Sequence, residues 1–162
     1  MTPRASDALS LSTRLLLGFL AGALAVLVFH QLAILAMTQA GIIQGNPYSF
    51  RPIKPWNVPA LVNSCFWGGL WGCVFALVAA RLPRGAAWYA AGFAFGVLGP
   101  VLVGWFVVAP IKGNPVAAGW IPARMLNSII INGLFGLGIA VFYSLLARPI
   151  AKRLVGQSKG SH

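Results

Sequence analysis

Residues 15–37 read LLLGFLAGALAVLVFHQLAILAM, a run of 23 residues without a single charged side chain. The hydrocarbon core of a bilayer is about 30 Å thick, and a helix rising 1.5 Å per residue needs about 20 apolar residues to cross it. The apolar region of a cleavable signal is shorter than this run. The stretch therefore predicts a membrane-spanning helix over Leu15–Met37.

Three further apolar runs predict spans over Ala60–Ala80, Ala86–Val108 and Met125–Leu146. The composition agrees, because 59% of the 162 residues are hydrophobic and 8% are charged, whereas about a quarter of a soluble domain is charged. Such a chain cannot cover itself with a charged surface. We therefore expect an all-α membrane protein with four transmembrane helices.

The net charge of +11 comes from 12 Lys and Arg against one acid, Asp7. The basic residues lie between the apolar runs, so they favour membrane topology and attraction to anionic lipid headgroups over nucleic-acid binding. With the N-terminus inside, four positive charges fall in the outer loops and eight in the cytoplasmic segments, which predicts both termini in the cytoplasm. The outer residues are Arg51, Lys54, Lys112 and Arg124, and the cytoplasmic ones are Arg4, Arg14, Arg81, Arg84, Arg148, Lys152, Arg153 and Lys159.

The chain divides into four predicted regions. Residues 1–14 form a cytoplasmic tail, 15–84 a first helical hairpin, 85–150 a second helical hairpin, and 151–162 a basic, mobile cytoplasmic tail. The two outer loops are rich in proline, which lowers the backbone entropy that folding must remove, so we expect them to be ordered caps.

The two hairpins resemble each other in sequence. Residues 56–76 align with 120–140 at an offset of 64 with seven identities, among them Trp56/Trp120 and Asn63/Asn127. Gly45-Asn46-Pro47 recurs at an offset of 68, and Gly18-Phe19-x-x-Gly22-x-Leu24 at an offset of 74. A repeat of two spans keeps its orientation, so the pattern predicts a tandem duplication about an axis along the membrane normal.

Small residues recur four positions apart on each span and form ridges. In lipid no hydrophobic effect draws helices together, and small residues let their backbones approach closely. These ridges are therefore predicted to be the packing seams of the bundle. Their members are Gly18, Gly22, Ser64, Gly72, Gly92, Gly96, Ser128 and Gly136.

Two polar residues, His30 and Asn132, interrupt the ridges at a similar depth, about 10 Å from the outer ends of their spans. A polar side chain in hydrocarbon needs a partner, so we expect the two to face each other or a shared water, with Gly68 and Gly104 leaving room beside them. The pair either fixes helix packing or marks a ligand site. Asn63 and Asn127, nearer the span ends, are expected to cap loop backbone.

Enzymatic chemistry finds little support in the sequence. The single acid lies in the N-terminal tail, so no span carries a carboxylate and no Ser/His/Asp set can form. Cys65 and Cys73 lie eight residues apart on one helix, too far for a disulfide. We therefore predict no catalytic, metal-binding or cofactor-binding residue, and no cofactor.

Residues 66–72, FWGGLWG, and 109–115, APIKGNP, resemble segments of small proteobacterial inner-membrane proteins of unknown function. The resemblance implies a multi-pass protein of the bacterial inner membrane and no particular activity. Small size and glycine-rich seams favour a scaffold, assembly factor or accessory subunit, whose partner is another membrane protein or a second copy. The alternative is an oligomeric small-solute channel or carrier, with the basic outer residues attracting an anion.

Overall fold

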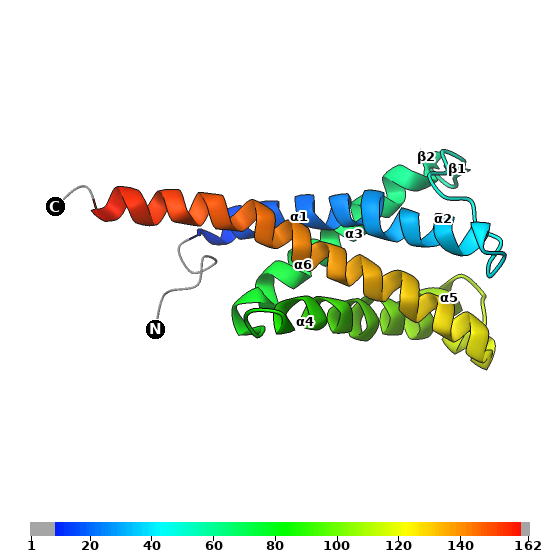
Figure 1. Ribbon diagram of the computed structural model, residues 1–162. Helices are drawn as coiled ribbons and strands as arrows, with labels where there is room; N and C mark the ends of the chain where they lie inside the picture. Colours follow the sequence, from blue (N-terminus) through cyan, green and yellow to red (C-terminus); the bar gives the residue numbers. More distant parts are fainter. Residues whose placement is uncertain (1–8, 160–162) are drawn as a thin grey trace.

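The computed structural model describes residues 9–159, with side chains described as far as Ile150. Within this part of the chain, four helices are long and apolar enough to cross a membrane, as predicted: Leu11–Gln39, Ala60–Arg81, Ala87–Ile111 and Pro122–Ile150. The first helix begins and the last ends at one end of the bundle, here called the terminal end (Figure 1). The loops over residues 40–59 and 112–121 lie at the opposite, loop end.

The first span consists of α1 (Leu11–Ala25), the π-helical segment η1 (Val26–His30) and α2 (Gln31–Gln39). It starts four residues before the predicted Leu15, because Ser10 caps it by accepting a hydrogen bond from the Thr13 amide at 3.2 Å. The sequence placed Arg14 outside the span. Its guanidinium is accommodated inside because it donates to the Ala76 carbonyl at 2.8 Å, near the C-terminal end of the second span.

The remaining spans also differ from prediction mainly at their ends. Pro122 starts the fourth helix, since proline is tolerated in a first turn. The third span contains Pro100 within a π-helical segment, where the missing proline N–H interrupts the regular ladder. The elements are β1 (Pro52–Ile53), β2 (Val58–Pro59), α3 (Ala60–Val78), η2 (Ala79–Arg81), α4 (Ala87–Gly96), η3 (Val97–Val101), η4 (Gly104–Val108), α5 (Ala109–Ile111), η5 (Val116–Trp120) and α6 (Pro122–Lys159).

The predicted tail from residue 151 is not separate from the fourth span, because α6 continues through it to Lys159. Figure 1 shows this continuation as a stalk that projects beyond the other helices. The predicted cytoplasmic Arg4 lies outside the described residues, and so do residues 160–162. The side chains of Lys152, Arg153 and Lys159 also lie outside them.

Helices α1 and α3 meet backbone to backbone along glycines. A Cβ atom on Gly18 would lie 2.5 Å from the Gly72 carbonyl oxygen, and one on Gly22 would overlap the Gly68 carbonyl. Beside this contact, the ring of Phe19 covers Gly69. Any side chain larger than hydrogen would push the two helices apart.

Helices α4 and α6 form a second seam of the same kind. A Cβ on Gly92 would lie 2.5 Å from the Cβ of Ala140, and one on Gly96 would overlap the Asn132 carbonyl. Gly136 packs against Gly92, and the ring of Phe93 covers Gly133. Of the residues predicted to pack helices, the six glycines lie in these two seams. Ser64 and Ser128 instead donate to carbonyls one turn earlier on their own helices, Ala60 and Arg124.

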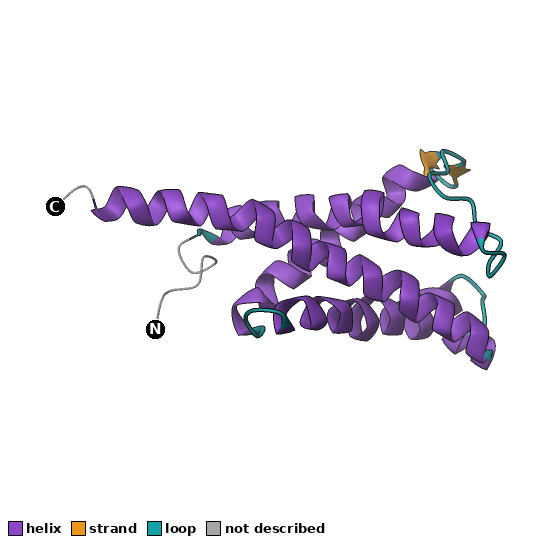
Figure 2. Cartoon of the chain, in the orientation of Figure 1, coloured by secondary structure: helices purple, strands orange, loops and turns teal. Residues whose placement is uncertain are grey.

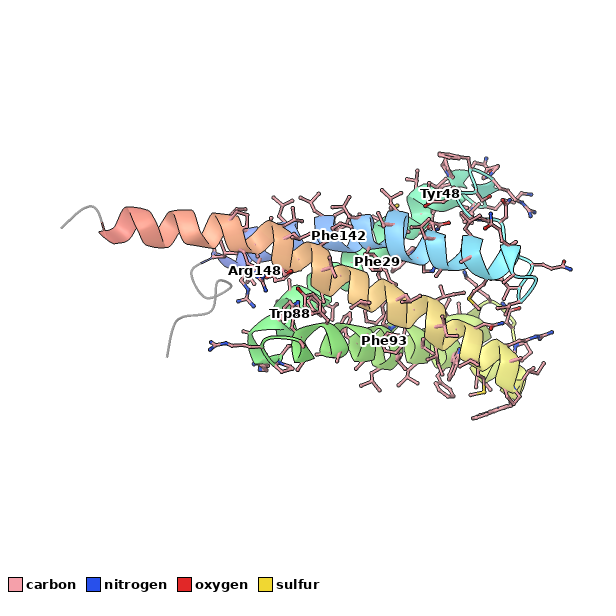
Figure 3. The ribbon with its side chains drawn as sticks, viewed as in Figure 1. Phe29, Tyr48, Trp88, Phe93, Phe142 and Arg148 are labelled. Atoms are coloured by element: carbon pink, nitrogen blue, oxygen red, sulfur yellow. The ribbon has the colours of Figure 1, made fainter. Side chains whose placement is uncertain are left out.

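Larger side chains fill the other two helix interfaces. Between η1 of the first span and α6, Phe29 meets Phe142 edge to face at 5.9 Å, with room made by Gly138 (Figure 3). Between α3 and α4, Phe75 contacts Trp88 and Phe95 at 5.3 and 5.2 Å. Phe75 is fully buried, so these rings form the centre of the core toward the terminal end.

The first loop is tied to the spans by hydrogen bonds. The Tyr48 hydroxyl donates to the Leu27 carbonyl in η1 at 2.9 Å, and the Tyr48 amide donates to buried Gln31 at 2.7 Å. A π-helical turn leaves a carbonyl without its usual partner, and Tyr48 supplies one. The loop also contains the short antiparallel pair β1–β2 (Figure 2). Two carbonyls of this loop, those of Arg51 and Ser49, accept hydrogen bonds from the first two amides of α3, as expected for an ordered cap.

We expect Gly22→Ala to destabilise the fold by about 1–3 kcal/mol or more, because its methyl group would meet the Gly68 carbonyl. Gly104→Ala is the matched control: a Cβ there meets nothing within 4 Å, so the change should raise stability by about 0.5–1 kcal/mol. Thermal unfolding of the detergent-solubilised protein measures both. Equal stability of the two variants would contradict the close packing of Gly22 against Gly68.

Candidate functional site

A cavity of about 230 Å³ lies in the loop half of the bundle, between all four spans. Each span contributes to its wall, so the cavity depends on how the two hairpins pack together. The lining residues are Val26 and His30 from the first span, Asn63, Ser64, Trp67, Gly68 and Trp71 from α3, Pro100 from η3, and Asn132 and Phe135 from α6.

His30 occupies the last position of the π-helical segment η1. Its ring meets the Phe135 ring edge to face at 6.2 Å, and its Nδ1 atom is buried without a hydrogen-bond partner among the described residues. π-Helical turns are rare in proteins overall, but those that occur are often found at functional sites. A buried polar atom without a partner is energetically costly, so this nitrogen requires an explanation.

Asn132 reaches the same cavity from α6. Its Nδ2 donates to the Ser128 carbonyl of its own helix at 2.9 Å, which uses one of its two amide hydrogens. The structure therefore brings His30, Asn132 and Gly68 to one cavity, but the Asn132 amide is anchored to its own helix and leaves the His30 Nδ1 unpaired. Gly104 does not line the cavity, and a Cβ there would face open space.

The wall formed by α3 carries residues that sequence reasoning did not assign to the site. Asn63, Trp67 and Trp71 follow one another at intervals of four and so share a helix face. Asn63 was predicted to cap the loop, yet it lines the cavity, and loop carbonyls of Ser49 and Arg51 satisfy the first amides of α3. A polar residue in register with two tryptophans was the available signal.

The cavity is closed toward the terminal end by aromatic rings. Trp71 packs on Gly99, whose added Cβ would lie 2.9 Å from the indole, and contacts Phe95 at 5.9 Å. Phe75 and its neighbouring rings fill the space below. At the other side Trp67 lines the cavity and is 56% exposed, so the cavity reaches the molecular surface there.

The chemistry that the cavity offers is hydrogen bonding and aromatic contact. Within residues 9–150, whose side chains are described, no charged side chain lines it. In the part of the chain that the structure describes, no three His, Cys, Asp or Glu residues gather as metal ligands, and the two cysteines are free. The predicted outer basic residues Arg51, Lys54, Lys112 and Arg124 are exposed at the loop end, outside the cavity lining.

Comparison with known protein families, with characterised proteins and with solved structures finds no match for this chain. The function must therefore be argued from the site and the surface of the molecule.

We expect His30→Leu to raise the stability of the isolated protein by about 1 kcal/mol, because it removes a buried nitrogen that has no partner among the described side chains. Gln31→Leu is the control on the neighbouring residue, and it should lower stability by about 1 kcal/mol because the Tyr48 amide loses its acceptor. Thermal unfolding in one detergent compares the two. A loss of stability in His30→Leu would show that His30 serves packing.

Proposed function

We propose that this protein is a non-catalytic subunit of a larger complex in the bacterial inner membrane, with an accessory or assembly role. The observation that carries the proposal is the exposure of the third span. Only 11% of its most apolar window is buried, against 44% for the fourth span. Every other glycine of the four spans has a neighbour that an added Cβ would meet, whereas Gly104 of the third span faces open space.

Such a surface suits a second transmembrane helix. Helices associate in lipid through close packing at small residues, and Gly104 offers a notch flanked by apolar side chains. The exposed large hydrophobic side chains of this span are Phe93, Leu98, Leu102, Val103, Phe106, Val107, Val108 and Ile111. The partner in this proposal is another membrane protein. The alternative is a second copy of the chain, and the mass of the complex distinguishes the two.

The tandem duplication belongs to the same proposal, and equivalent contacts support it. Arg14 donates to the Ala76 carbonyl, and Trp88 donates to the Ala140 carbonyl at 2.9 Å. The two donors are 74 residues apart and the two acceptors 64 apart, which are the offsets of the sequence alignment. The covering of Gly69 by Phe19 and of Gly133 by Phe93 follows the same offsets.

A cytoplasmic location of the terminal end completes the proposed topology. The distribution of positive charge supports it, since Arg81, Arg84 and Arg148 lie at that end and the loop end carries fewer basic residues than the cytoplasmic segments. The exposed cations of the loop end then lie near the outer headgroups, where they can attract anionic lipid.

A small-solute channel is the less favoured alternative. The rings of Trp71, Phe75 and Phe95 close the cavity toward the terminal end, so one copy offers no continuous polar path. A channel would have to form between several copies.

The topology predicts opposite labelling of two cysteine variants made in a background with Cys65 and Cys73 replaced by alanine. Phe50→Cys should react with a membrane-impermeant thiol reagent on intact spheroplasts, because Phe50 is exposed at the loop end. Pro83→Cys, exposed in the turn after η2, should react only after the membrane is opened. The reverse pattern would overturn the proposed orientation.

The partner is tested by native mass spectrometry of the protein extracted gently from its own membrane. We expect a second protein at a constant ratio, and its loss in Gly104→Leu, which fills the notch at a position where an added Cβ meets nothing within 4 Å. Leu145→Phe adds bulk at an exposed position of α6 and should keep the partner. A lone homo-oligomer, or a partner unaffected by Gly104→Leu, would contradict the proposal.

A further inference from the structure

We infer that the cavity between the four spans binds the uncharged polar head of a membrane-soluble molecule, a planar ring with carbonyl acceptors on an apolar tail, as in the quinone class. This site is separate from the exposed face of the third span, since Gly104 does not line it. The inference therefore goes beyond an accessory role.

The polarity of the wall defines the charge of the ligand. Among the residues that the structure describes, no Lys, Arg, Asp or Glu lines the cavity. A charged group held there would lack a counter-ion in a region of low dielectric constant, which is strongly unfavourable. A charged phospholipid headgroup is thus a poor occupant, and an uncharged head is favoured.

The hydrogen-bonding groups favour a ligand that accepts. Asn132 has a second amide hydrogen beyond the one given to Ser128, and the Asn63 amide also lines the cavity. The His30 side chain also lines the cavity, and one nitrogen of a neutral imidazole carries a proton that it can donate. These donors come from three spans, so a molecule with two separated carbonyl oxygens could bridge them.

The size of the cavity favours the head of a molecule rather than a whole one. A volume of about 230 Å³ lies below the ~300–1,000 Å³ of pockets that enclose complete small ligands. The tail of such a molecule must remain outside. Trp67 lines the cavity and is also exposed on α3 among apolar neighbours such as Phe66, so the cavity meets the surrounding hydrocarbon beside it.

The aromatic wall favours a ring over an open chain. Trp67, Trp71 and Phe135 come from two helices and line the cavity together with the polar groups. Flat faces of this kind pack against a planar head. Ester carbonyls of a neutral glyceride share the acceptor chemistry but lack the ring, so the experiment must separate the two sources.

The test is quenching of tryptophan fluorescence by a decyl-benzoquinone in detergent micelles containing the full chain, because bound quinone would lie beside Trp67 and Trp71. We expect saturable quenching that Ser64→Phe abolishes by filling the cavity. Ser128→Phe is the matched control, because Ser128 makes the same hydrogen bond to its own helix but lies outside the cavity lining. His30→Phe should weaken binding about tenfold, the loss of one hydrogen bond.

A second matched pair keeps the test valid if Ser64→Phe fails to fold. Asn63→Ala should weaken quenching about tenfold, whereas Asn127→Ala, its counterpart in α6, should not. Quenching that rises linearly and equally in all variants would overturn the inference. Displacement of the quinone by dioctanoylglycerol at lower concentration would overturn the quinone assignment in favour of a glyceride. Neither result would change whether the partner protein is lost in Gly104→Leu, which native mass spectrometry measures separately.

Discussion

The contact on which the rest of the structure depends is the meeting of helix backbones at glycine. Gly18 and Gly22 of the first span lie against Gly72 and Gly68 of α3 so closely that no Cβ fits between them. In a bilayer, apolar side chains gain nothing by leaving lipid for protein, so association needs dense van der Waals contact. Glycine seams supply that contact within each hairpin, between α1 and α3 and between α4 and α6.

Two tight seams force a looser arrangement elsewhere. The helices cannot all touch at glycine, so the α3–α4 side is bridged by large rings centred on Phe75. These rings fill the terminal half of the bundle and stop at Trp71. On the loop side of Trp71 no comparable seam closes the space between the helices, and the cavity occupies it. The cavity is thus a consequence of packing two narrow hairpins into one bundle with side chains of unequal size.

Irregular backbone borders the cavity on two spans. Segment η1 ends at His30, and segment η3 contains Pro100, so both helices depart from the α-helical ladder where they contribute to the wall. The first loop stabilises one of these departures, because Tyr48 gives its hydroxyl hydrogen to the Leu27 carbonyl and its amide hydrogen to Gln31. Loop, π-helical turn and cavity wall are therefore coupled through hydrogen bonds. A molecule in the cavity would contact a wall whose shape the loop helps to maintain.

The sequence by itself determined the four spans and the glycines that line their seams, because length and hydrophobicity decide what a bilayer accepts. It also marked His30 and Asn132 as polar residues at one depth. It could not assign Arg14 to a span, since that depends on an acceptor at Ala76, 62 residues away in the chain. It could not place Asn63, Trp67 and Trp71 on the cavity, or Gly104 outside it, because periodicity defines the face of a helix and not its neighbour. Only the tertiary structure decided those neighbours, because they depend on how the two glycine-seamed hairpins pack against each other.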